Sequence, residues 1–230
     1  MNRDQILKEM GLGPIWKLRQ PPKKKRGETA PAEPVGVDDR TAAIAAMDWD
    51  TLKQAVADCT ACELCQTRKQ AVLGVGDIEA DWLFIGEGPG AEEDERGEPF
   101  VGQAGKLLDA MLAAIDLKRG NSVYIANAVK CRPPNNRTPE PGETAACWPF
   151  LARQIELIQP KLIVTLGKPA AQTLLQQEVT ISRSRGMVQD FAGIPLIVTY
   201  HPAYLLRNLP DKAKAWEDLC FMRKTMASLR

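Results

Sequence analysis

Four short apolar runs divide the chain, and each ends in a cluster of glycine, proline and polar residues. The runs cover residues 82–85, 123–126, 162–166 and 195–200. They are uncharged and rich in aliphatic and β-branched residues, a composition typical of strands buried on both faces. Between them, apolar residues recur at helical spacing over residues 105–115, 144–158 and 170–175. Strands that alternate with helices predict a parallel sheet covered by helices on both faces.

We therefore expect an α/β fold, a three-layer sandwich around a central, mostly parallel four-stranded sheet. In such sheets the ligand site forms beyond the carboxyl ends of the strands. The polar clusters after the four runs would share that edge: residues 86–90, Asn127, residues 167–169 and His201. His201 is the only histidine of the chain, and it stands where the last run breaks at Pro202. Its role is either structural, as the cap of a loop, or functional at the shared edge.

Composition separates an amino-terminal segment, residues 1–40, from a globular part, residues 41–230. The segment holds nine of the 30 Lys and Arg residues and six of the 29 Asp and Glu residues, so the remainder is slightly acidic. It contains a short helix pattern, an apolar stretch that could dock a partner protein, the basic run 23–26 and a Pro-rich linker of disordered composition. The basic run is either a solubilising tether or a non-specific contact to a phosphate backbone.

The size and composition of the chain suit one sizeable domain with a tail. The chain has 230 residues, of which 44% are hydrophobic, and a formal net charge of +1. No apolar run reaches the length of a membrane span, and the first residues do not have the pattern of a signal peptide. We therefore expect a cytoplasmic protein without a membrane partner. Its six cysteines should then be metal ligands or free thiols rather than disulfides.

Five cysteines have a spacing that indicates a metal centre. Three lie within seven residues and two lie far downstream: Cys59, Cys62, Cys65, Cys131 and Cys147. A Cys-x2-Cys pair can chelate a metal from one turn, and a distant pair can close the site across the fold. Four thiolates suit zinc as well as an iron–sulfur cluster, and one cysteine would be spare. Cys220 lies in a late helical pattern and is predicted to be a core thiol.

The loop after the first run, residues 86–90, is rich in glycine but carries an acid at Glu87. It lacks the Lys-Ser/Thr of a P-loop and the glycine spacing of a dinucleotide fingerprint. A carboxylate at this position argues against phosphate binding and suits the ordering of a water or the acceptance of a hydrogen bond. The alternative, a tight strand-to-helix turn, explains the glycines but not the acid.

Several motifs together resemble family-four uracil-DNA glycosylases, the iron–sulfur-containing branch of their superfamily. The resemblance covers roughly residues 50–225, and its blocks are residues 86–90 (GEGPG), 93–94, 97, 99–105 (PFVGQAG), 127, 130–134 (KCRPP) and 201–207 (HPAYLLR). It implies a uracil-DNA glycosylase fold and a [4Fe-4S] cluster held by Cys59, Cys62, Cys131 and Cys147, with Cys65 spare. It further implies a DNA-repair hydrolase that flips uracil out of DNA, cleaves its N-glycosidic bond and leaves an abasic site, the first step of base excision repair.

The resemblance also assigns roles in a base pocket. Asn127 would pair with O4 and N3–H of uracil, Phe100 would stack on the flipped base, and His201 would stabilise negative charge at O2. The same pocket would include Gly86, Gly88 and Asn136.

The residue that orients the attacking water departs from the pattern of better-known relatives. These carry an Asp directly after the position of Glu87, where this chain has Gly88. We therefore expect Glu87 to orient the water, with Glu93 as the second candidate.

The remaining motif residues would contact DNA. Leu205, with Leu206 beside it, would enter the duplex where the base leaves, although an amphipathic helix start that buries both leucines is the alternative. Arg207 would contact a phosphate and Arg132 the DNA strand, and further candidates with weaker support are Arg137, Arg183 and Arg185.

Two other kinds of protein are compatible with parts of the pattern. One is a glycosylase of the same superfamily that forms a covalent adduct through a second histidine, which this chain lacks. The other is a non-catalytic iron–sulfur module that binds DNA or senses redox state. As an enzyme, the chain would act as a monomer on single- or double-stranded DNA that contains uracil, and residues 1–40 would dock a repair or replication protein.

Overall fold

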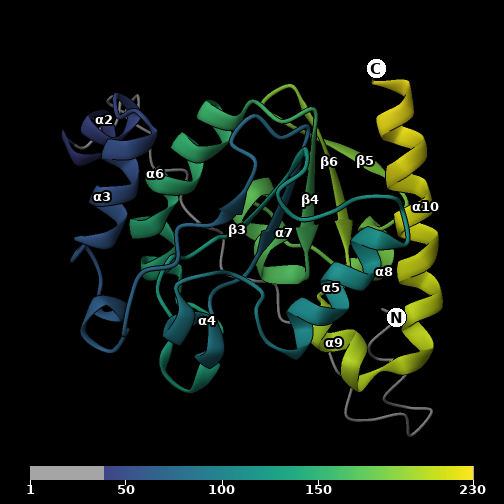
Figure 1. Ribbon diagram of the computed structural model, residues 1–230, viewed down its shortest axis with the longest axis horizontal. Helices are drawn as coiled ribbons and strands as arrows, with labels where there is room; N and C mark the ends of the chain where they lie inside the picture. The colour runs from purple at the N-terminus through teal and green to yellow at the C-terminus, as the bar shows by residue number, and fades with distance from the viewer. Residues whose placement is uncertain (1–38, 230) are drawn as a thin grey trace, which may run out of the picture. The chain divides into compact units, whose positions relative to one another are not determined.

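The fold is built on one six-stranded sheet (Figure 1). The structure is a computed structural model, and it describes residues 39–229. The strand order is β1-β3-β2-β4-β6-β5. The four predicted runs form its parallel centre: β2 (Trp82–Gly86), β3 (Val123–Asn127), β4 (Leu162–Leu166) and β6 (Ile194–Thr199). The predicted α/β class and parallel centre are therefore confirmed.

The sheet has two more strands than the sequence predicts, and both are antiparallel edge strands. β1 (Val75–Gly76) pairs with β3 over only two residues, too short to leave a pattern. β5 (Val188–Phe191) pairs with β6 through a hairpin, and its residues are only half-buried or exposed. An apolar run does not mark such a strand, so the prediction of four strands is corrected to six.

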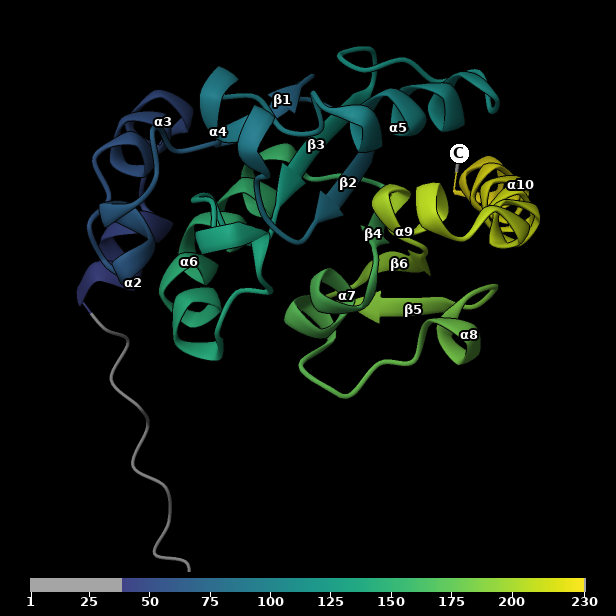
Figure 2. The same ribbon diagram turned by 90° about the horizontal axis from the view of Figure 1, so that it is seen from below.

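Helices cover both faces of the sheet (Figure 2). On one face, α5 (Gln103–Ala113), α9 (Pro202–Arg207) and α10 (Lys212–Ser228) pack against alternate residues of the strands. On the other face, α6 (Pro141–Ile158) and α7 (Lys168–Leu175) pack against the intervening residues. The three predicted helices are thus present, and the third layer confirms the sandwich.

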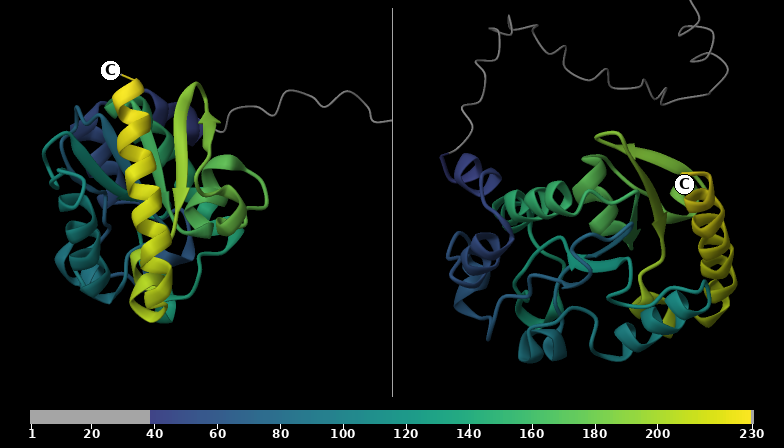
Figure 3. Two further views of the ribbon diagram at one scale, coloured as in Figure 1. Left: turned by 90° about the vertical axis from the view of Figure 1, so that its right-hand side faces the viewer. Right: turned by 45° about the horizontal axis from the view of Figure 1, so that its top comes forward.

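A smaller core lies beside α6 (Figure 3). Here α2 (Asp39–Ala45) and α3 (Trp49–Ala57) contribute Ile44, Leu52 and Val56, which pack with Phe150 of α6 and with two of the cysteines. The short elements are α4 (Ala91–Arg96), α8 (Ile181–Ser184) and three 3₁₀ turns, Glu63–Gln66, Pro134–Asn136 and Leu209–Asp211.

Three further expectations from the sequence concern Cys220, the amino-terminal segment and membrane-spanning helices. Cys220 is exposed on α10, because the buried face of that helix carries Leu219 and Met222 instead, so the predicted core thiol is wrong. The docking segment and linker predicted for residues 1–40 lie almost entirely outside the described residues. Among residues 39–229, no helix is both long and apolar enough to span a bilayer.

Candidate functional site

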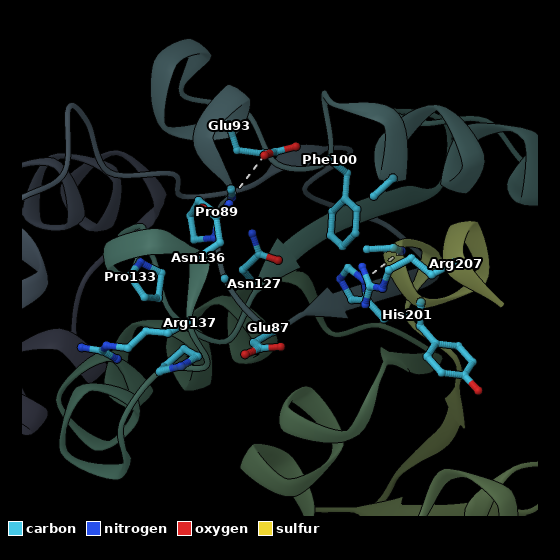
Figure 4. A pocket seen from close by; sticks show the side chains of 16 residues that line it. Glu87, Pro89, Glu93, Phe100, Asn127, Pro133, Asn136, Arg137, His201 and Arg207 are labelled. Carbon is cyan, nitrogen blue, oxygen red and sulfur yellow. Dashed lines mark hydrogen bonds between the residues drawn. The ribbon is translucent and has the colours of Figure 1, made fainter.

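A pocket of about 400 Å³ opens at the carboxyl edge of the parallel strands (Figure 4). The register of the sheet places Gly86 at the end of β2 directly beside Asn127 at the end of β3. The pocket wall combines residues from all parts of the resemblance: Glu87, Gly88, Glu93, Phe100, Asn127, Asn136, His201 and Arg207. The topology thus brings together side chains that lie up to 120 positions apart in the sequence.

Asn127 is the buried amide of this pocket. It is only 2% exposed, and its amide oxygen has no hydrogen-bond partner within the described chain. That oxygen points toward Phe100 and His201 (Figure 4). A buried acceptor without a donor is costly, so a ligand that donates here gains the full hydrogen bond.

Gly86 is required for this arrangement. A Cβ at Gly86 would lie 2.6 Å from Cζ of Phe100 and would also overlap the side chain of Asn127. Because the two side chains close over the glycine, any larger residue would push the amide and the ring apart. Gly86 therefore shapes the pocket without contacting a ligand through a side chain.

His201 is held as a neutral imidazole. It caps the start of α9, and its Nδ1 accepts a hydrogen bond of 3.1 Å from the backbone N–H of Ala203. The pKa of His201 is lowered to about 4, chiefly by burial and also by the nearby Arg207, against the opposing effect of Glu93. With Nδ1 accepting, the single ring proton lies on Nε2, so His201 can donate one hydrogen bond.

Phe100 lies beside the histidine, with a distance of 5.5 Å between ring centroids. Its backbone has a positive φ of 55°, a strained conformation for a bulky residue. Arg119 holds it there, because its guanidinium donates to the carbonyl oxygens of Pro99 at 2.7 Å and of Phe100 at 2.8 Å. The following α5 passes so close that a Cβ at Gly105 would overlap the same Phe100 carbonyl.

Glu93 braces the loops around the ring. One carboxylate oxygen accepts hydrogen bonds from the N–H groups of Val101 and Gly102, at 2.9 and 3.1 Å, and the other accepts one from Gly90 at 3.1 Å. Both oxygens are thus engaged by the backbone. This arrangement favours a positioning role for Glu93 over the orientation of a water.

Glu87 is the second carboxylate that lines the pocket. Burial raises its pKa above the ordinary value, and a hydrogen bond with the hydroxyl of Thr138 opposes the rise. Glu87 also lines a neighbouring groove between α6 and α7, so it lies between the base pocket and a second opening. A carboxylate with a raised pKa and access to solvent is suited to accept a proton from water.

The two leucines of α9 have opposite environments. Leu205 is 1% exposed and packs in the main core, whereas Leu206 is 41% exposed. Burial argues against the wedge role that the sequence assigns to Leu205, because the six-residue helix turns that side chain inward. Leu206 is therefore the leucine that faces solvent, and Arg207 next to it lines the pocket.

The other candidate arginines differ in their contacts. Arg132 donates to the side-chain oxygen of Asn136 at 2.8 Å, which fixes both residues at the pocket rim. Arg137 forms a bidentate pair with Glu143, and Arg185 pairs with Asp218 and Glu217. Arg183 is exposed on α8, and it is absent from the described wall of the pocket.

The five clustered cysteines line one small cavity between α3, α6 and the segment after β3. Arg68 donates to Sγ of Cys131 at 2.9 Å, and the backbone N–H of Lys130 donates to Sγ of Cys147 at 3.2 Å. Burial raises the pKa of Cys147 to about 12, and the adjacent Lys130 opposes the shift. An all-sulfur donor set with N–H donors on its sulfurs fits a thiolate-bound metal group.

Sequence reasoning missed four parts of the site: Arg119, Thr138, Arg68 and the N–H of Ala203. Each acts on a motif residue through a contact between distant segments or through the backbone. Local pattern carries no signal for such contacts.

Comparison with known proteins agrees with the geometry. The model of the Uracil DNA glycosylase superfamily matches residues 73–220. The chain is 48% identical over 167 residues to the type-4 uracil-DNA glycosylase of Thermotoga maritima, which covers 72% of this chain and 86% of the relative. Identity to the type-4 uracil-DNA glycosylase of Archaeoglobus fulgidus is 46% over 165 residues, or 68% of this chain and 82% of the relative. The chain belongs to the uracil-DNA glycosylase superfamily.

Proposed function

We propose that the chain is a DNA-repair hydrolase that cleaves the N-glycosidic bond between uracil and deoxyribose in DNA. The observation that carries the proposal is the buried, unpartnered amide oxygen of Asn127, which faces a pocket that also holds His201. Uracil presents a donor at N3 and acceptors at O4 and O2. The names of the type-4 relatives support the same reaction.

Recognition would take place on a base that has left the stack. The Asn127 oxygen accepts N3–H of uracil, and the amide nitrogen donates to O4. Cytosine has an acceptor at N3 and a donor at C4, so it would leave both groups of Asn127 unpaired, at a cost of roughly 10²-fold or more in rate. Phe100 contributes a stacking face for the flipped ring.

Bond cleavage would depend on His201. As the C1′–N1 bond breaks, its electron pair passes to uracil and negative charge collects at O2, while the sugar becomes an oxocarbenium ion. The Nε2–H of the neutral His201 donates to O2 and stabilises this anion. Water then adds to C1′, and Glu87 accepts the proton that the water loses.

The end of α9 would bind the DNA. Leu206 fills the space that the flipped base leaves, at a cost of a few kcal/mol of unstacking, and Arg207 contacts a phosphate. Arg132 contributes a further contact from the opposite rim. These groups are far apart in the sequence, and the shared edge of the sheet brings them together.

We infer that Cys59, Cys62, Cys131 and Cys147 hold a [4Fe-4S] cluster. The support is the small cavity that these cysteines line together with Cys65, and the N–H donors on two of its sulfurs. Four thiolates around one zinc ion would stand about 4 Å apart. Within residues 39–229, no three candidate ligand side chains converge enough to hold such a single ion. When bound, the cluster supplies a covalent tie between the start of the domain, the segment after β3 and α6.

A uracil-release assay tests the enzyme proposal. A duplex that contains one uracil is incubated with the wild type, Asn127→Ala or His201→Ala, under single-turnover conditions. We expect release by the wild type and a loss of about 10²–10³-fold in each variant, with DNA affinity retained. A protein that binds the duplex but releases no uracil would instead be a non-catalytic binding module.

Two further assignments stay predictions. A monomeric state is checked by light scattering of the full chain with and without DNA. Docking through residues 1–40 is checked by comparing the full chain with a variant that lacks them, in binding to purified replication proteins.

A further inference from the structure

Lys130 is a buried cation between the base pocket and the cysteine cavity. It is 1% exposed and is among the largest fully buried side chains of the domain. It follows Asn127 by three residues and precedes Cys131. The segment 127–131 therefore runs directly from the uracil-reading amide to a cysteine of the proposed cluster.

Its two nitrogen atoms contact the two sites separately. The side-chain ammonium donates a hydrogen bond of 2.8 Å to the backbone carbonyl oxygen of Asn127. The backbone N–H of Lys130 donates to Sγ of Cys147 at 3.2 Å, and the side chain lines the cysteine cavity. One residue thus fixes the strand end that carries the recognition amide and also contacts a sulfur.

A buried ammonium needs a counter-charge. No carboxylate forms an ion pair with Lys130 within the described chain, and the groups that attract its charge are Cys147 and Cys131. Lys130 is joined to the first of these cysteines through its backbone N–H and to the second through the peptide bond, so its position follows the positions of both.

We propose that Lys130 is a positioning residue that makes uracil recognition by Asn127 depend on the metal centre. This inference rests on the proposed uracil site and on the proposed cluster. With the cluster bound, Cys131 and Cys147 are fixed, and Lys130, which is joined to both, holds the carbonyl of Asn127. Without it, the two cysteines are free to move, and the strand end loses the bond that orients the amide. The cluster thereby acts on base recognition through position, without a redox step.

The test measures binding of free uracil by calorimetry to the cluster-loaded full chain. In Lys130→Met, a neutral side chain of similar length, we expect about tenfold weaker binding, because a hydrogen bond to a charged group is lost. Iron content and visible absorption should match the wild type. The control is Lys69→Met, an exposed lysine paired with Glu95, which should bind uracil as the wild type does. Unchanged uracil affinity in loaded Lys130→Met overturns the proposal.

A second arm separates coupling from a merely structural role. Removal of the metal should weaken uracil binding in the wild type but not further in Lys130→Met, which has already lost the bond to the carbonyl of Asn127. Equal losses in both proteins overturn the coupling. A wild type that contains no iron–sulfur cluster refutes the cofactor assignment, and a loaded wild type that binds no uracil refutes the proposed function, so each failure is distinguishable.

Discussion

The backbone N–H of Ala203 donates a hydrogen bond to Nδ1 of His201 and thereby decides which ring nitrogen carries the proton. The amide is supplied by the first turn of α9, because His201 is the cap of that helix. The hydrogen-bond donor of the proposed reaction is therefore set by the backbone, and a change in pH within the physiological range does not alter it. An imidazolium would donate from both nitrogens and would lose the bond to Ala203.

We predict that His201 stays neutral down to acidic pH. Its pKa of about 4 lies below the ordinary 6.5, because burial and Arg207 disfavour the charged form. Since the chain has one histidine, ¹⁵N-labelled protein gives the two nitrogen signals of one imidazole ring to follow by NMR. The signal should show protonated Nε2 and unprotonated Nδ1 from pH 8 to about pH 5. A titration midpoint near 6.5 would contradict this assignment.

Glu87 should control the acid limb of the rate profile. As the base it must be ionised, so the single-turnover rate rises with pH through its pKa, which burial places above the ordinary 4.5. Thr138→Val removes the hydrogen bond that lowers this pKa, so the limb should move to higher pH, whereas Thr138→Ser should leave it in place. Glu87→Gln should lower the rate roughly 10²-fold and abolish the limb. A limb that persists in Glu87→Gln assigns the base to another group.

Leu205 and Leu206 should separate stability from DNA opening. Leu205→Ala removes a core side chain and should lower the free energy of unfolding by about 2–5 kcal/mol in urea denaturation. Leu206→Ala should leave stability within about 0.5 kcal/mol but slow uracil release from duplex more than from single strands. The opposite pattern, with a stability loss only in Leu206→Ala, would reverse the assignment.

Asp218 should be a major determinant of stability. It is 1% exposed, accepts a hydrogen bond of 2.7 Å from Thr199 near the end of β6, and pairs with Arg185 at 2.9 Å. Asp218→Ala leaves the partly buried Arg185 without that partner, so we expect a loss of about 3 kcal/mol in the free energy of unfolding. Glu217→Ala, which removes an exposed partner of the same arginine, is the control and should cost less than about 1 kcal/mol.

The parallel centre of the sheet follows from sequence because its signal is local. Each central strand is an uncharged run, and each ends in residues that a shared edge brings together. The strand β5 gives no such signal, since its register comes from a hairpin with β6 and its residues are half-exposed. Patterns of this kind identify buried strands and miss edges.

The candidate site also has parts that local sequence predicts and parts that it does not. The motifs predict that Asn127, Phe100 and His201 share a pocket, and the structure places them there. The role of Glu93 depends on the amides of Val101 and Gly102 in another segment, beside that of Gly90 in its own helix cap. The choice between the two leucines of α9 depends on how a six-residue helix is rotated. Both are tertiary facts, which local composition does not contain.

The strained backbone of Phe100 has a consequence for the variation that this enzyme can tolerate. The residues that hold the ring in place, Arg119 and Gly105, contact its backbone carbonyl and are not part of the described pocket wall. A survey of substitutions that scores repair in cells should therefore record a second group of intolerant positions, remote from the chemistry. Such positions would be mistaken for folding defects, although the fault would be a misplaced stacking surface in a protein that is otherwise intact.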